Sequence, residues 1–86
     1  MNKHNHNFVE TYKGLVGFGY DRETDENTVE YYLQKFSDDQ LMEIIKKKFS
    51  DDELSEIFFL ISKLLQKHLS EQEYHKLFLK DDSHGD

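Results

Sequence analysis

The chain has 86 residues, a formal net charge of −7 and no cysteine. Its length allows one domain, its acidity argues against a surface that binds free nucleic acid, and the missing thiols exclude disulfides, thiolate metal sites and cysteine nucleophiles. Small secreted domains usually depend on disulfides, so this composition favours a cytoplasmic protein. The longest apolar run, residues 57–61, is too short to cross a bilayer.

The first predicted element is a helix over residues 8–18, which follows a polar tail at 1–6. Apolar side chains recur there at helical spacing: Phe8, Val9, Tyr12, Leu15 and Val16. Gly14 weakens such a helix by about 1 kcal/mol, and Gly17 or Gly19 is suited to end it. A short hairpin around the glycines is the alternative. Their order, GxxGxG, does not fit a phosphate-binding loop.

The second predicted helix covers residues 27–36, with Asp25 or Asn27 as its N-cap. It has one apolar face, which we expect to point into the core: Val29, Tyr32, Leu33 and Phe36. The acidic residues before it alternate as in a calcium loop. However, Glu26 stands where such a loop needs glycine, and Tyr32 stands where it needs glutamate, so the sequence does not predict an EF-hand.

A repeated FSDD, at residues 36–39 and 49–52, belongs to a series of helix starts. At each start a serine is followed three residues later by Gln or Glu, which is a capping box. The three boxes are Ser37–Gln40, Ser50–Glu53 and Ser70–Glu73. They predict helices over residues 38–48, 51–68 and 71–79, followed by a polar tail at 80–86. The acidic starts and the basic ends of these helices complement their dipoles.

The sequence shows no pattern typical of a metal site, a cofactor site or a catalytic centre. The histidines form no HExxH or ExxH motif, and a pair such as His4 and His6 in a polar tail would pay ordering entropy to bind a metal. No serine lies in a GxSxG turn. We therefore expect no metal, no cofactor and no enzymatic activity.

A helix-turn-helix at the closely spaced helices 38–48 and 51–68 is a further interpretation. The second helix would have to present its first residues to DNA bases. Those residues are Asp51, Asp52, Glu53 and Glu56, which would repel phosphate. The sequence therefore does not predict DNA binding.

Several large side chains lie away from the predicted apolar faces. On the helix over 51–68, Phe59 falls among polar residues, and Leu60 lies at the margin of the apolar arc. One interpretation is that the N-terminal segment covers Phe59, and the other is contact with a second chain. The residues that we expect to bind a partner are Phe59, Tyr31, Phe18, Tyr20 and Leu60.

Together these patterns predict an all-α single domain over residues 7–79, built from four or five short helices. The expected function is that of a small, acidic, non-catalytic adaptor or regulatory domain that binds another protein or a second copy of itself. The alternative is an acidic inhibitor or nucleic-acid mimic that masks a basic site on a partner protein. No direct contact with nucleic acid or a membrane is expected.

Overall fold

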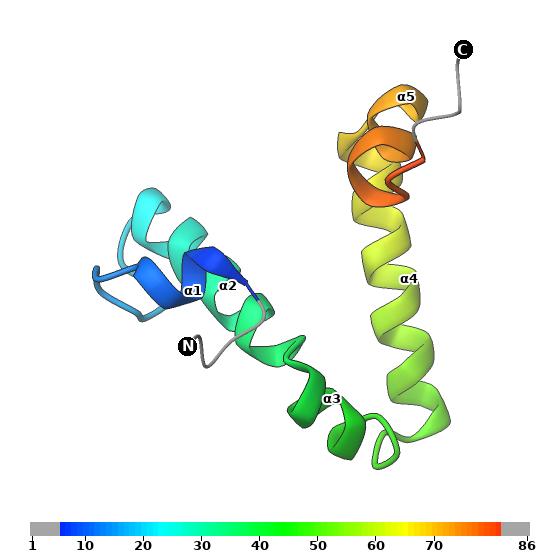
Figure 1. The fold of residues 1–86 in the computed structure, drawn as a ribbon, viewed down its shortest axis with the longest axis horizontal. Helices are drawn as coiled ribbons and strands as arrows, with labels where there is room; N and C mark the ends of the chain where they lie inside the picture. Colours follow the sequence, from blue (N-terminus) through cyan, green and yellow to red (C-terminus); the bar gives the residue numbers. More distant parts are fainter. Residues whose placement is uncertain (1–5, 82–86) are drawn as a thin grey trace. The chain divides into compact units, whose positions relative to one another are not determined.

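A computed structural model describes residues 6–81 and confirms the predicted all-α fold class, with no strand in this range (Figure 1). Its elements are α1 (Asn7–Thr11), α2 (Arg22–Phe36), α3 (Asp39–Ile45), α4 (Asp51–His68), α5 (Glu71–Glu73) and the π-helical stretch η1 (Tyr74–Phe78). The chain divides into two compact units, with the boundary between Lys48 and Phe49. We call them the N-terminal unit, with α1–α3, and the C-terminal unit, with α4, α5 and η1.

The predicted domain limits concern segments that the structure describes only in part. Most of the two predicted tails, 1–6 and 80–86, lies outside the described residues. The prediction of a single domain over residues 7–79 concerns both units together, and it stays a prediction.

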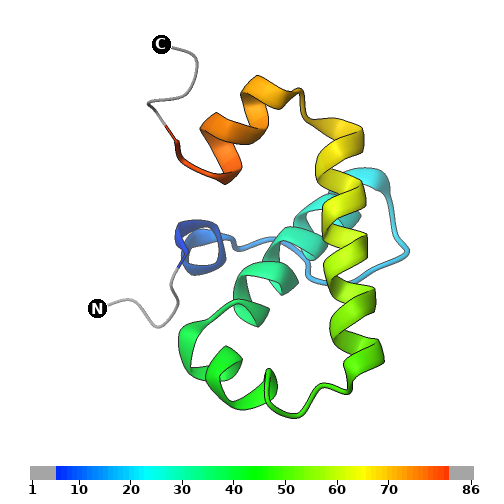
Figure 2. The ribbon, with the colours of Figure 1, turned by 90° about the vertical axis from the view of Figure 1, so that its right-hand side faces the viewer.

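The segment before α2 is mostly an irregular loop. Helix α1 ends at Thr11, not at residue 18 as the apolar spacing predicts, and Tyr12 is already extended. The glycine-rich residues that follow form neither the helix nor the hairpin that the sequence suggests. Glycine disfavours the helix because its backbone loses more conformational entropy on folding than that of any other residue. Figure 2 shows α1 beside α2, against which it packs.

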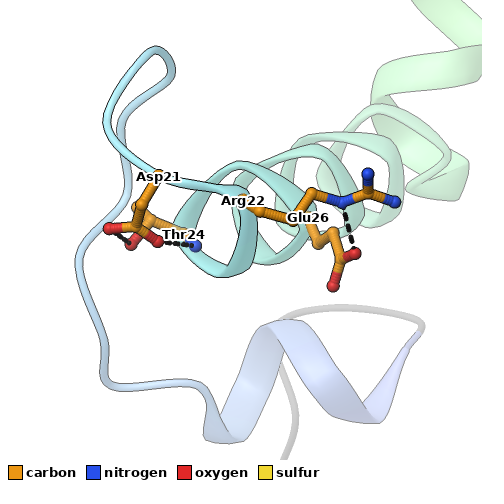
Figure 3. A network of polar contacts seen from close by, with 4 residues as sticks. All are labelled: Asp21, Arg22, Thr24 and Glu26. Atoms are coloured by element: carbon orange, nitrogen blue, oxygen red, sulfur yellow. Dashed lines mark hydrogen bonds and ion pairs between the residues drawn. The ribbon is translucent and has the colours of Figure 1, made fainter.

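Helix α2 begins five residues earlier than predicted, because Asp21 is its N-cap. The Asp21 carboxylate accepts hydrogen bonds from the Thr24 amide at 2.9 Å and from the Thr24 hydroxyl at 3.1 Å (Figure 3). The predicted caps, Asp25 and Asn27, therefore lie inside the helix. Figure 3 also shows the Arg22–Glu26 ion pair, with 2.6 Å between Nε and Oε2.

The first predicted capping box is absent, because the next residue takes the role of the serine. Asp38 is the N-cap of α3, and its carboxylate accepts hydrogen bonds from the amides of Gln40 at 3.1 Å and Leu41 at 3.3 Å. Ser37 instead ends α2, and its hydroxyl donates to the Gln34 carbonyl at 3.2 Å. Helix α3 also stops at Ile45, three residues before the predicted end.

The other two capping boxes are confirmed. In α4, the Ser50 hydroxyl accepts from the Glu53 amide at 3.1 Å, while the Glu53 carboxylate accepts from the Ser50 amide at 2.9 Å. Ser70 and Glu73 repeat this exchange at 3.1 and 2.8 Å. Helix α4 has the predicted bounds, 51–68.

After α5 the backbone widens, and the Leu79 amide donates to the Tyr74 carbonyl at 3.0 Å, five residues earlier. The rings of Tyr74 and Phe78 are stacked along this stretch, with 5.3 Å between their centroids. Lys80 then takes a left-handed conformation with φ of 58°, which ends the helical path.

The different roles of Ser37 and Ser50 predict different costs of removing each hydroxyl. Ser50→Ala loses an N-cap and should lower the free energy of unfolding by about 1 kcal/mol, as Asp38→Ala should. Ser37→Ala removes no N-cap and should cost less than about 0.5 kcal/mol. Urea unfolding followed by circular dichroism measures these differences. Equal losses for the two serine variants would contradict the assignment of caps.

The Ser70–Glu73 box predicts a pH dependence for α5. Hydrogen bonds from the backbone and the side chain of Ser70 hold the pKa of Glu73 below its ordinary value of 4.5. Because the folded-state pKa is the lower one, the stabilisation is complete above the unfolded-state pKa and is lost as the pH falls through the folded-state pKa. The protection of the Ser70 amide against hydrogen exchange, relative to its intrinsic rate, should fall as the pH drops through the lowered pKa of Glu73. Glu73→Gln, which keeps an acceptor but does not titrate, should remove this pH dependence.

Candidate functional site

Helix α2 packs within its unit through its more polar face. Thr28 is 4% exposed, and Tyr31 and Gln34 are half-buried. The Gln34 side-chain carbonyl accepts a hydrogen bond from the Val9 amide at 2.9 Å, and the Tyr31 ring lies 6.1 Å from the Tyr12 ring. Contacts to α1 and to the following loop therefore occupy this side of α2.

The opposite face of α2 is apolar and exposed. Its residues are Val29, Tyr32, Leu33 and Phe36, and we call them the α2 stripe. The exposed fractions of Tyr32 and Leu33 are 64% and 60%. The sequence predicts that this face points into the core. Within the N-terminal unit, Thr28 and Gln34 hold the N-terminal segment on the other side of the helix. Within the N-terminal unit, the stripe is therefore the face of α2 that does not pack against α1 and the loop.

Two side chains of α2 fix the loop that approaches the stripe. The Thr28 hydroxyl accepts from the Gly17 amide and donates to the Gly17 carbonyl, both at 3.0 Å. The Asp25 carboxylate accepts from the amides of Gly19 at 2.8 Å and Tyr20 at 3.3 Å. Gly19 has a φ of +98°, which a residue with a side chain adopts only with strain. These bonds hold the intervening residue, Phe18, from both sides.

Phe18 extends the α2 stripe into a groove. The groove is open, has a volume of about 640 Å³ and is lined by three apolar residues, Phe18, Val29 and Leu33. A second hollow of about 410 Å³ shares these three residues and adds Thr28 and Tyr32. Phe18 is 71% exposed, so its ring is a wall of the groove and not a buried plug. We call the larger hollow the α2 groove.

The polar lining of the α2 groove is predominantly acidic. It consists of Arg22, Asp25, Glu26, Glu30 and Gln34. The Arg22 guanidinium is paired with Glu26, so the three carboxylates and one guanidinium leave a net charge of −2. Glu30 accepts a hydrogen bond from the Gln34 amide group at 3.4 Å, which is a weak interaction. The groove thus combines apolar lining residues, which we call its floor, with a polar lining of net negative charge, which we call its edge.

The structure places the three N-terminal residues that the sequence predicts to bind a partner in different surroundings. Phe18 lines the α2 groove. Tyr20 is exposed on the loop but does not line the α2 groove. Tyr31 lies on the packed side of α2, against Tyr12, and the Lys35 ammonium is 5.4 Å from its ring centroid. Only Phe18 therefore belongs to the groove.

The other two predicted residues, Phe59 and Leu60, belong to α4 in the C-terminal unit. Both are exposed, and the Phe59 ring meets the Phe58 ring edge to face with 5.6 Å between centroids. The C-terminal unit has its own hollow of about 420 Å³, lined by residues of α4, α5 and the turn between them: Ser62, Leu65, Gln66, Leu69, Ser70, Glu71 and Tyr74. Neither Phe59 nor Leu60 lines it.

Within residues 6–81 no three histidine, aspartate or glutamate side chains are grouped to hold a metal ion. His6 lies 2.8 Å from the Ser37 hydroxyl, and His4 is outside the described range. No helix in the described part of the chain has the length and hydropathy of a membrane span.

Comparison of the chain with known proteins finds no matching family model, no matching curated protein and no matching solved structure. The candidate site is therefore defined by its geometry. Sequence patterns did not reveal Asp25 and Thr28 as anchors of the loop, because their partners are backbone groups 5 to 11 residues away. The sequence did offer one signal: Asp25 and Thr28 are polar residues between the glycine cluster and the α2 stripe.

Removal of the Thr28 hydroxyl tests how the site is held. Thr28→Val keeps the shape of the side chain but leaves the amide and carbonyl of Gly17 without this partner, which should cost about 1–3 kcal/mol. Thr28→Ser keeps the hydroxyl and should cost less. Urea unfolding measures the cost, and NMR shifts of the Phe18 ring report the position of the loop. Identical behaviour of the two variants would contradict the anchoring role.

Proposed function

We propose that the chain is a small, non-catalytic adaptor or regulatory domain that binds another protein through the α2 stripe and Phe18. The observation that carries this proposal is the orientation of α2, which uses its polar face for internal packing and leaves its apolar face exposed. Exposed apolar patches edged by polar residues are typical of interaction sites.

The composition of the surface supports the same proposal. Phe18 and Tyr32 are large aromatic side chains of the kind that dominate binding energy at protein interfaces. In the C-terminal unit, Phe58 and Phe59 offer a second aromatic pair. The partner is another protein in the cytoplasm, and we propose no catalytic step, cofactor or metal.

An acidic inhibitor or nucleic-acid mimic is less well supported. A mimic needs carboxylates directed outward at the spacing of phosphates. Four of the described carboxylates instead accept hydrogen bonds from backbone amides at helix starts: Asp21, Asp38, Glu53 and Glu73. A mimic would also make no use of the exposed apolar stripe.

A photo-crosslinking residue at position 32 tests the proposed surface in native cytosol. We expect one discrete adduct with another protein, and none from the same residue at position 23, on the same helix outside the groove. A second substitution, Leu33→Asp, should reduce the adduct by at least about tenfold, because it places a charge in the apolar contact. Circular dichroism controls for folding of the variant.

The salt dependence of the adduct separates the two candidate functions. Apolar docking predicts that the adduct survives at high ionic strength, whereas a mimic predicts steep loss. Absence of an adduct at position 32, or equal adducts at positions 32 and 23, would contradict binding through the α2 stripe.

A further inference from the structure

We propose that the α2 groove binds an apolar, basic helical segment of the partner protein. This inference rests on the proposed function and specifies the chemistry of the partner. It follows from the shape of the groove, from the charge of its edge and from the way in which the edge is fixed.

The floor of the α2 groove has the form that an apolar helix face requires. Val29 and Leu33 are four residues apart on α2, so they lie one above the other on the same face. Phe18, held by the loop, stands beside them as a wall. An amphipathic helix fits such a slot by placing apolar side chains from successive turns against it.

The edge of the groove selects the charge of the occupant. Asp25, Glu26 and Glu30 line it, and Arg22 neutralises only one of them. Lysine or arginine side chains that flank the apolar face of a helix would meet these carboxylates, whereas acidic side chains would be repelled. Complementary charge at the edge sets the choice and orientation of the partner, while the apolar floor provides most of the affinity.

The position of the Asp25 carboxylate is fixed before a partner binds. The amides of Gly19 and Tyr20 both donate to one of its oxygens, so the group is ordered within the lining of the groove. Glu30 is held only by a 3.4 Å hydrogen bond from Gln34 and can turn toward a cation at little cost. The groove therefore has one ordered and one adaptable acceptor.

The net charge argues against a second copy of the chain as the occupant. Two copies would each bring a charge of −7, and the acidic edge would face an acidic molecule. Like charges placed across an interface are unfavourable, so a basic partner is the better match.

The test uses the full chain and two designed helical peptides as probes. The first has leucine on one face and lysine on the other, and the second has glutamate in place of every lysine. Binding is followed by NMR shifts of Phe18, Val29 and Leu33 and by calorimetry. We expect the lysine peptide to bind with shifts at these three residues and the glutamate peptide to bind at least about tenfold more weakly.

Matched variants locate the interaction. Glu30→Gln should weaken binding of the lysine peptide by about two- to fivefold, because it removes one exposed charge pair. Glu23→Gln makes the same chemical change on α2 outside the groove and should leave binding unchanged. Leu33→Ser should weaken binding by at least about tenfold. Thermal unfolding of each variant controls for loss of structure.

Some outcomes would overturn the inference without overturning the proposed function. Equal binding of the two peptides, or equal effects of Glu30→Gln and Glu23→Gln, would show that the edge does not select a basic partner, while the adduct at position 32 would still identify a protein-binding surface. Sedimentation as a dimer that Leu33→Ser dissociates would instead assign the groove to a second copy. Loss of the adduct together with loss of peptide binding would reject both proposals.

Discussion

The N-terminal unit depends on the bonds between one buried hydroxyl and one backbone residue. Thr28 both accepts from and donates to Gly17, and it is one of only two buried residues in the described range, the other being Val9. A buried hydroxyl that lacks partners is costly, so this exchange fixes which side of α2 faces the N-terminal segment. Gln34, which binds the Val9 amide two turns further along, confirms the same orientation. The position of Phe18 and the exposure of the α2 stripe both follow from this choice.

The proposed function gives this arrangement a physical purpose. Each unit buries little apolar surface, and large side chains such as Leu33, Phe58 and Phe59 stay exposed. A partner that covers such side chains would add buried apolar surface, and it would stabilise the folded state by mass action. The acidic edge of the α2 groove would add selectivity, because charge acts mainly on the choice of partner and on the rate of encounter.

Helix caps illustrate both the reach and the failure of sequence patterns. The boxes at Ser50 and Ser70 form as predicted, because each satisfies its own orphan amides within one turn. At Ser37 the same sequence pattern does not form a capping box, since Asp38 caps α3 and Ser37 ends α2. The start of α2 was missed for a related reason: several acidic and amide residues compete to cap it, and Asp21 prevails through its bonds to Thr24. Where two neighbouring residues can cap a helix, the pattern alone does not rank them.

The sequence by itself determined the all-α class, the bounds of α4 and the two reciprocal caps, because these depend on interactions between residues at most four apart. Only the tertiary structure decided which face of α2 packs and where Phe18 lies. Those features rest on hydrogen bonds between residues 11 and 25 positions apart, from Gly17 to Thr28 and from Val9 to Gln34. Apolar periodicity does not reveal these contacts, since it marks the apolar side of a helix and not the polar groups that hold its other side. In this unit specific polar bonds to the backbone determine the packing, and the apolar face is left for the surface.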